Sequence, residues 1–434
     1  MMFYKETNFK ETPIGKVPKD WIIDKLGTLC RFKRGFSYRS SQITSSRTQI
    51  RFLTINDIEK EGGLKREAEK LYIREGVEID PEFFVDEGDV FIANTDMAKG
   101  FIIGAPVLMK NIDEKYVYSM DLTKLIFNKA EVDSGFLFYY LTHPSMRRRM
   151  KAAAQGTNVL HLNHVIVRNF FIPLPPFPEQ QKIAEILSTV DEAIQKTNEI
   201  IAKTGRLKKG LMQELLTKGI GHKEFKDTEI GRIPKEWEVV RLETIGDIVN
   251  GFAFPIKYQG KKNGKYIFAK VSDTNLPGNE KYISVTENTI DDEVAEKLGV
   301  KIYPSGTIIF PKIGMVIYLR KVRILTKAGT FDNNIMGIIP NEKIINREFL
   351  YYLLLEKIDL TKLIGKTTTP SIRKSEVKKL KIPCPSLSEQ QKIVEILLAI
   401  DKKLEIGRKE KVKLERIKQG LMDLLLTGKI RVRI

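Results

Sequence analysis

Hydrophobic and polar residues follow two different patterns along this chain. Beginning near Glu179, and again near Ser388, apolar residues recur at heptad spacing, which is typical of a long amphipathic helix that packs against another helix. Each predicted helix runs for about 38 residues, or about 57 Å. A proline-rich segment, IPLPPFP from Ile172, precedes the first helix and ends any earlier element.

We expect the two helices to be each other's partners. If the two halves are related by a pseudo-two-fold axis, the helices run antiparallel as a coiled coil. The alternative, in which each helix folds back onto its own module, stays open. The apolar positions expected at the helix–helix seam are Ile183, Ile186, Val190, Ile194, Leu207, Leu211, Ile393, Ile396, Ile400, Leu414, Ile417 and Leu421.

The remaining sequence alternates short β-like runs with turns. Residues about 20–171 and 237–381 contain runs such as IRFLTI, DVFIA, TIIF and VIYLRKVRIL, separated by breaks such as KEGGLK. GFLFYYLTHPSMRRRMK and EFLYYLLLEKI are predicted helices. The fold class is therefore α+β, with two pseudo-two-fold-related domains separated by the helix pair. The predicted segments are 1–171, 172–220, 221–381 and 382–434.

The chain contains an internal repeat. Residues 172–220 align without a gap to 382–430, an offset of 210, and 22 of these 49 positions are identical. ETPIGKVPKDW, from Glu11, matches DTEIGRIPKEW, from Asp227, at an offset of 216. The ends of each half agree whereas the middles differ in length and sequence. This indicates duplication of a whole domain plus a helix, rather than a solenoid.

Composition narrows the class of partner. The 434 residues carry a net charge of +18, which favours a polyanionic partner such as nucleic acid. Residues 221–388 carry +8 and residues 1–178 carry +4. The two cysteines, Cys30 and Cys384, exclude a disulfide scaffold and a cysteine-rich zinc domain. No apolar run approaches a membrane span and no signal core opens the chain, so we expect a cytoplasmic protein.

The order of these segments resembles a known family. The helix motif P-L-P-P-x-x-E-Q-x-x-I, the opening I-G-x-[IV]-P-x-[DE]-W of each half and the helix ends K-x-G-L-M-x-x-L-L-T are similar to those of type I restriction–modification specificity subunits. The resemblance covers essentially the whole chain. It implies two target-recognition domains that each bind one half of a bipartite duplex DNA site, separated by helices that act as a spacer.

The resemblance also implies the partners. The helices would bind two methyltransferase subunits, and endonuclease/translocase subunits would complete the assembly. The specificity subunit itself would have no catalytic site and no cofactor. Because the two modules differ in sequence, the expected DNA target is two unlike short sequences with an unread gap.

Basic and polar loops supply the candidate DNA contacts, because base edges are recognised by hydrogen-bond donors and acceptors. In the first module the candidates are Arg34, Phe36, Ser37, Tyr38, Arg39, Asn94, Thr95, Lys99, Gln155, Thr157, Asn158 and His161. In the second module they are Lys257, Lys261, Lys262, Lys312, Thr367, Thr368, Ser371, Arg373 and Lys374.

Each candidate has a plainer interpretation. A basic loop is often only solvated surface. Phe36 and Phe252 could stack on bases, but an aromatic residue after a strand more often packs in a core. Arg147–Arg149 could contact phosphates or complement a helix end.

Catalytic and metal-binding motifs are missing from the sequence. It has neither a Walker A pattern nor a G-x-G-x-x-G after a strand. His161 and His164 lie close in sequence, but without neighbouring cysteines we expect no metal site. Two alternatives to a specificity subunit stay open: a stand-alone sequence-specific or architectural DNA-binding protein, and an enzyme with an unrecognised nuclease or methylase site.

Overall fold

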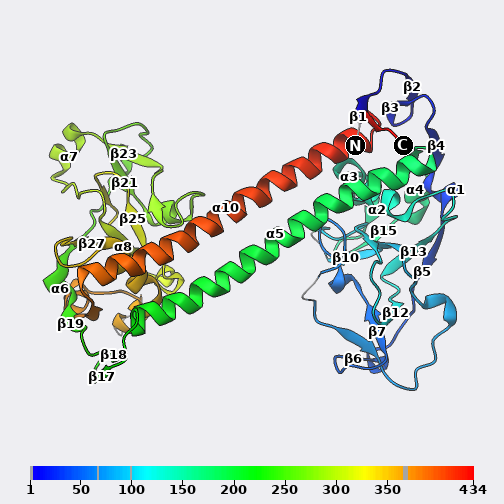
Figure 1. Ribbon diagram of the computed structural model, residues 1–434. Helices are drawn as coiled ribbons and strands as arrows, with labels where there is room; N and C mark the ends of the chain where they lie inside the picture. Colours follow the sequence, from blue (N-terminus) through cyan, green and yellow to red (C-terminus); the bar gives the residue numbers. More distant parts are fainter. Residues whose placement is uncertain (1–2, 66–67, 98–99, 365–369) are drawn as a thin grey trace. The chain divides into compact units, whose positions relative to one another are not determined.

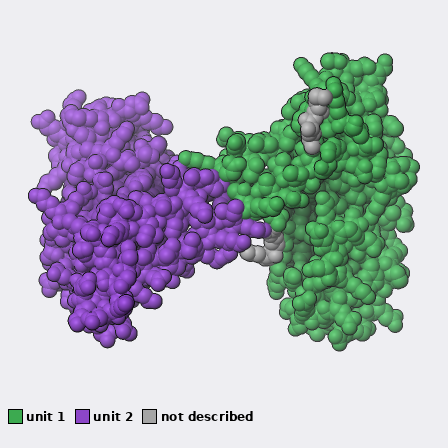
Figure 2. Space-filling view, in the orientation of Figure 1, with its two compact units in different colours: residues 1–198, 409–434 green, residues 199–408 purple. Residues whose placement is uncertain are grey.

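The structure is a computed structural model that divides into two compact units, coloured separately in Figure 2. The residues it describes are 3–65, 68–97, 100–364 and 370–434. Unit 1 comprises residues 1–198 and 409–434, and unit 2 comprises residues 199–408. Each unit therefore contains one module together with parts of both long helices.

The two long helices are α5 (Phe177–Lys218) and α10 (Leu387–Leu425), coloured green and red in Figure 1. They confirm the prediction from heptad spacing. A glutamine that is identical in the two repeats helps to fix the start of each helix. Gln180 donates to the carbonyl of Pro175 at 3.0 Å, and its own side-chain oxygen accepts from the backbone N–H of Asp133 at 2.9 Å. Gln390 makes the equivalent bonds to Pro385 and Asn346.

Within each unit the helices run antiparallel. In unit 1 the pair Asp191 and Lys418 is 2.6 Å apart, and Lys418 lies late in α10 whereas Asp191 lies early in α5. In unit 2 Lys208, late in α5, lies 2.5 Å from Asp401, early in α10. Both arrangements agree with the predicted antiparallel pair.

The seam uses only part of the predicted set. Ile183 and Ile393 are fully buried, and Leu404, which was not among the predicted positions, is also buried. Leu207 is 55% exposed, and Ile396 and Ile417 are exposed as well. These three residues therefore lie outside the seam, which corrects the prediction. Three apolar columns run along each helix, and heptad spacing alone does not tell which two face the partner. The other predicted seam positions are buried or half-buried: Ile186, Val190, Ile194, Leu211, Ile400, Leu414 and Leu421.

Each helix also packs against its own module. The core of unit 1 joins Phe136 of the module to Ile183 and Leu187 of α5 and to Met422 and Leu425 of α10. The core of unit 2 joins its module to both helices in the same way. The two packing alternatives left open by the sequence are thus both realised, since each helix contacts its partner and its module.

The first module is built from short strands in several small sheets. One sheet has the antiparallel order β11 (Pro106–Leu108), β9 (Val90–Ala93), β13 (Leu122–Ile126) and β5 (Arg31–Arg34). A second has the order β12 (Lys115–Tyr118), β7 (Ile50–Leu53), β8 (Leu71–Ile73) and β6 (Ile43–Thr44), and only its β12–β7 pair is parallel. A third has the order β10 (Thr95–Met97), β15 (Val159–Leu162) and β14 (Ala154–Gln155).

Each unit also contains several two-stranded antiparallel sheets. In unit 1 these pairs are β4 (Ile22–Lys25) with β16 (Phe171–Leu174), β2 (Phe9–Thr12) with β3 (Gly15–Pro18), and β1 (Phe3–Lys5) with β29 (Ile430–Val432). In unit 2 they are β19 (Glu238–Arg241) with β28 (Lys381–Cys384) and β17 (Phe225–Thr228) with β18 (Gly231–Pro234). The repeated P-x-[DE]-W segments connect these strands, from β3 to β4 and from β18 to β19, and their tryptophans, Trp21 and Trp237, are almost fully buried.

The second module has a larger sheet with the order β20 (Gly246–Asn250), β27 (Ile335–Pro340), β24 (Ile308–Pro311), β25 (Arg323–Leu325) and β22 (Tyr282–Ile283). A smaller sheet has the order β23 (Asn288–Ile290), β21 (Tyr266–Ala269) and β26 (Gly329–Phe331). The short helices are α1 (Leu26–Leu29), α2 (Ser134–Thr142), α3 (Pro144–Ala152) and α4 (His164–Arg168) in unit 1, and α6 (Leu242–Ile245), α7 (Asp292–Leu298), α8 (Arg347–Tyr352) and α9 (Lys374–Lys379) in unit 2.

Three predicted elements differ in detail. The helix predicted from Gly135 is divided into α2 and α3 because Pro144 restarts it with His143 as N-cap. The strand predicted from Val316 is a 3₁₀ helix over Met315–Leu319, followed by strand β25. The helix predicted from Glu348 continues after α8 as a π-helical turn over Leu353–Lys357.

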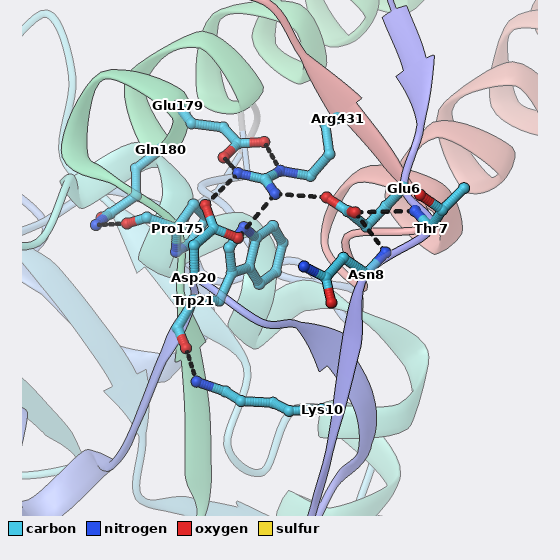
Figure 3. A network of polar contacts seen from close by, with 10 residues as sticks. All are labelled: Glu6, Thr7, Asn8, Lys10, Asp20, Trp21, Pro175, Glu179, Gln180 and Arg431. Carbon is cyan, nitrogen blue, oxygen red and sulfur yellow. Dashed lines mark hydrogen bonds and ion pairs between the residues drawn. The ribbon is translucent and has the colours of Figure 1, made fainter.

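A buried ion cluster ties the end of the chain to the start of α5 (Figure 3). The guanidinium of Arg431 donates to both carboxylate oxygens of Glu179 at 2.7 Å. It also bonds Asp20 at 2.9 and 3.0 Å and Glu6 at 2.8 Å. In unit 2 the repeat-equivalent Glu389 instead accepts from the indole N–H of Trp237 at 2.9 Å. The glutamate at this position of the repeat thus has a different polar partner in each unit, Arg431 in unit 1 and Trp237 in unit 2.

Among the described residues, no helix is both long and apolar enough to span a lipid bilayer. The long helices α5 and α10 are interrupted throughout by charged side chains, which pair with each other or face solvent.

Candidate nucleic-acid interface

A glycine–phenylalanine turn occupies the same place in both modules. Phe36 forms a parallel bridge with Ser119, and Phe252 forms one with Asp332. A Cβ atom on Gly35 would lie 2.3 Å from the carbonyl oxygen of Ser119, and one on Gly251 would lie 2.0 Å from that of Asp332. The repeated glycine is therefore required because two backbone segments touch at this point.

In the first module two of the predicted stretches meet at the loop of residues 119–121. Arg34 donates to the carbonyl of Met120 at 3.3 Å, and the side-chain amide of Asn94 donates to the same carbonyl at 3.2 Å. Thr95 donates to the carboxylate of Asp121 at 2.8 Å. Segments about 60 residues apart in the sequence are thus brought to one edge of the module.

The third stretch joins them through the small sheet β10–β15–β14. Thr95 pairs with His161, and His161 pairs with Gln155 on the other side. The side chains of Gln155, Thr157, Asn158 and His161 are exposed. The described residues of all three stretches predicted from the first module therefore meet at one edge of it, which we call the first module's face.

Asn94 and Thr95 support this face from behind rather than on its surface. They are only 4% and 6% exposed. The side-chain oxygen of Asn94 accepts from the Thr123 hydroxyl at 2.7 Å and lies 2.8 Å from Nε2 of His164. Their hydrogen-bonding groups are used within the protein, so these two predicted contact residues act as supports.

His164 is held in its neutral form by its surroundings. Burial lowers the pKa of His164, and the nearby positive charges of Arg34 and Arg168 lower it further. Because the side-chain oxygen of Asn94 can only accept, Nε2 of the neutral ring is the donor in this contact. The histidine fixes the orientation of the Asn94 amide, and with it the loop that carries Met120.

Phe36 and Tyr38 pack within the module. Phe36 makes edge contacts with Phe52 and Phe83, and the Tyr38 ring lies 4.8 Å from that of Phe52. Ser37 and Arg39, which alternate with them, are exposed beside Arg34. The plainer interpretation of Phe36 as a core aromatic therefore holds.

In the second module the candidates gather around Lys312. Its ammonium donates to the side chain of Asn250 at 2.9 Å, and the next residue, Ile313, bridges to Ser371. Burial lowers the pKa of Lys312. Arg373 is exposed and Lys374 begins α9 directly after this bridge. The end of β24 is thus brought to the segment before α9, as the end of β9 is brought to β15 in the first module.

The remaining basic candidates of the second module lie on a separate loop. Lys257 and Lys262 are exposed, whereas Lys261 forms an ion pair with Asp291. An exposed ion pair of this kind leaves the lysine accessible to a competing phosphate. Lys99, Thr367 and Thr368 lie outside the described residues.

Exposed apolar side chains beside both faces escaped the sequence-based prediction. Met97 pairs with Val159 at the tip of the β10–β15 sheet, and both are exposed. Met315 and Tyr318 are exposed in the 3₁₀ helix that follows Lys312. Tyr318 lies in a segment whose sequence pattern is that of a buried strand, and only the structure places it at the surface.

Arg147 has a structural role. It is 5% exposed and donates to the carbonyls of Ile103, Phe101 and Lys60 at 2.9–3.3 Å. Arg149 lies over the ring of Phe170 at 4.3 Å. Contact of Arg147 with a DNA phosphate is therefore excluded in this conformation.

Within the described part of the chain, no group of three His, Cys, Asp or Glu side chains is arranged to hold a metal ion. Cys30 is buried, and burial raises the pKa of its thiol to about 12. A thiol in such a site stays protonated and is a poor nucleophile.

The repeated connectivity, with two unlike polar faces built on one shared pair of helices, defines a tandem two-module binding protein. Residues 18–204 and 234–416 match a family model described as "Type I restriction modification DNA specificity domain". The chain belongs to the family of type I restriction–modification specificity proteins.

Individual relatives agree along their whole length. The chain is 32% identical to the type I restriction enzyme MjaVIII specificity subunit of Methanocaldococcus jannaschii, over 100% of this chain and 98% of the relative. It is 31% identical to the putative MjaX specificity subunit of the same organism, covering 100% and 99%. The crystal structure of a type I restriction–modification S subunit from M. genitalium shares the fold, with a TM-score of 0.58, 17% identity and coverage of 94% and 96%.

Proposed function

We propose that this chain is the DNA specificity subunit of a type I restriction–modification system. Each module would recognise one half of an asymmetric bipartite duplex site. The observation that carries this proposal is the duplication itself: two unlike polar faces stand at equivalent places in modules of related fold, and each module is joined to the same pair of helices. The full-length similarity to proteins named as specificity subunits supports it.

The exposed side chains of each face have the chemistry that base recognition needs. In the first module Gln155, Asn158 and His161 offer donors and acceptors, while Arg34 and Arg39 supply positive charge. In the second module the exposed Arg373 and the half-buried Lys312 and Ser371 would play these parts, and the lysines of the 257–262 loop would contact phosphates. The supporting residues Asn94 and Thr95 act through the face that they hold.

Catalysis is delegated to partner subunits in this proposal. Two methyltransferase subunits bind along the helices, and endonuclease/translocase subunits complete the assembly in the cytoplasm. Apolar side chains exposed on the helices offer part of such a surface: Ile200, Leu207 and Ile406 in unit 2, and Val412 and Ile417 in unit 1. An isolated chain leaves these side chains in water, and binding of a protein partner would bury them.

The test is to express the chain with its methyltransferase partner in a host without DNA methylation and to map the modified adenines. The proposal expects one motif made of two short, unlike sequences and a gap of fixed length. Tight, specific DNA binding by the lone chain, with no methylation from a partner of demonstrated activity, would instead support a stand-alone DNA-binding protein. Methylation or cleavage by the purified chain alone would show an enzyme.

A further inference from the structure

A tyrosine, an aspartate and a lysine meet where the first module contacts the two helices. The hydroxyl of Tyr139, on α2 of the module, donates to Asp191 of α5 at 2.9 Å. The other carboxylate oxygen of Asp191 lies 2.6 Å from the ammonium of Lys418, on α10. That ammonium also lies 5.7 Å from the centre of the Tyr139 ring. We call these three residues the first joint cluster.

The second module repeats the arrangement in unit 2. The hydroxyl of Tyr352, on α8, donates to Asp401 of α10 at 2.6 Å. Asp401 lies 2.5 Å from the ammonium of Lys208 on α5, which lies 5.6 Å from the Tyr352 ring. Tyr352, Asp401 and Lys208 form the second joint cluster. It has an additional member, Lys281, which donates to the Tyr352 hydroxyl at 3.1 Å.

The two clusters are equivalent in the repeat. Asp191 and Asp401 are 210 residues apart, as are Lys208 and Lys418, and both pairs are among the identical positions of the helices. The tyrosine comes from the module, whose sequence differs between the halves. The aspartate comes from one helix and the lysine from the other. In each unit the same three residue types therefore join the module to both helices.

The cluster adds a directional contact in the middle of each module–helix interface, beside the hydrogen bonds that Gln180 and Gln390 make at the helix starts. Around it, module and helices share a hydrophobic core, and apolar packing depends on buried area rather than on orientation. A hydrogen bond to a carboxylate weakens steeply when its angle changes. All four charged side chains are partly buried, between 20% and 35% exposed, so water competes with these bonds only in part.

We propose that Tyr139, Asp191 and Lys418, with their counterparts Tyr352, Asp401 and Lys208, are positioning residues that fix the angle of each module on the helix pair. They thereby set how many base pairs separate the two recognised half-sites. This inference rests on the proposed function. A rotation of about 6° displaces a point about 35 Å away by about one base-pair step, so a small loss of rigidity at the joint is enough to change the gap.

The test compares gap lengths. The chain is expressed with its methyltransferase, and methylation is measured on a library of sites with constant half-sites and gaps one or two base pairs shorter or longer. Tyr139→Phe and Tyr352→Phe, singly and together, keep the ring and remove the hydrogen bond. Tyr140→Phe is the matched control, because Tyr140 lies on the same helix and its hydroxyl donates to the carbonyl of Phe171 of its own module, at 3.5 Å, rather than to a long helix.

We expect wild type and Tyr140→Phe to methylate a single gap length. In each single variant the preference for that gap over its neighbours should fall by about tenfold, the factor that corresponds to the loss of one hydrogen bond to a charged group, and in the double variant it should fall further. The half-site sequences should stay the same. Lys418→Met should act in the same direction, and Lys418→Arg should restore the preference.

Reduced methylation with an unchanged gap preference would overturn the inference, because it would assign the clusters to stability alone. The proposed function fails in a different way. If wild type directs no bipartite methylation at any gap length, the chain is not a specificity subunit, and the inference falls with that function.

Discussion

The guanidinium of Arg431 donates two hydrogen bonds of 2.7 Å to the carboxylate of Glu179, although the two residues are 252 positions apart in the sequence. Glu179 is 1% exposed and lies in the first turn of the first long helix, whereas Arg431 lies in the strand that follows the second. Glu6 and Asp20 bond the same guanidinium. The bidentate pair therefore links both helices and the start of the chain within unit 1.

Removing Arg431 should destabilise unit 1 strongly. Arg431→Met leaves the Glu179 carboxylate buried without a cation, and breaking a buried ion pair on one side costs about 3–5 kcal/mol. Urea unfolding followed by tryptophan fluorescence should show the loss, since Trp21 packs beneath the guanidinium at 5.6 Å. Arg433→Ala is the matched control because Arg433 is exposed, and it should leave the midpoint unchanged. Equal midpoints for both variants would contradict the role assigned to the ion cluster.

His164 should titrate below its usual value. Burial and the charges of Arg34 and Arg168 lower its pKa from 6.5, so the unfolded chain binds a proton at a higher pH than the folded chain. Stability from this site is complete above pH 6.5 and is lost as the pH falls towards the lowered pKa. With only four histidines in the chain, imidazole ¹⁵N NMR can follow each one. A His164 pKa of 6.5 or above would refute this account of the Asn94 support.

Replacing the glycine of the repeated Gly-Phe pair, even by alanine, should destabilise the protein. In Gly35→Ala the new Cβ atom would lie 2.3 Å from the Ser119 carbonyl oxygen, so a backbone segment of the candidate DNA face must move. We expect a loss of stability of about 1–3 kcal/mol, as for other overpacked sites, and weaker recognition of one half-site. Gly205→Ala, in α5 with open space around it, should instead be neutral or stabilising. A Gly35→Ala protein with wild-type stability and DNA recognition would contradict the close-contact explanation.

Lengthening the helices should lengthen the gap in the DNA target. Seven residues inserted in each helix, after Asn198 and after Arg408, keep the heptad phase and add about 10 Å. At about 3.4 Å per base pair this is about three base pairs. Mapping the methylated sites of the insertion variant measures the gap directly. An unchanged gap would show that the helices do not act as the spacer.

Part of this architecture could be predicted from the sequence because it depends on local patterns. Heptad spacing identified α5 and α10, and the repeat of the Glu-Gln-Gln segment located both helix starts. The phase of the seam could not be predicted in the same way. Leu207 and Ile417 have the spacing of seam residues, yet Lys208 and Lys418 of the neighbouring column face the partner helix.

The candidate DNA-binding face, too, could be predicted from the sequence only in part. Loop composition identified Gln155, Asn158 and His161, which are exposed as expected for a contact surface. Asn94 looked similar in sequence, but its partners Thr123 and His164 are distant in the chain and bury it. Long-range hydrogen bonds of this kind leave no local signal, and neither does the exposed Tyr318, whose segment has a strand-like pattern.

The central claim is that each module recognises its own half of the DNA site. The most direct measurement is the methylated motif of the wild-type chain compared with that of a Gln155→Ala, His161→Ala double variant, each expressed with the methyltransferase partner. Both side chains are exposed on the first module's face, so the fold should be retained. We predict that one half of the motif becomes relaxed while the other half and the gap stay unchanged. Relaxation of both halves together, or of neither, would contradict the account.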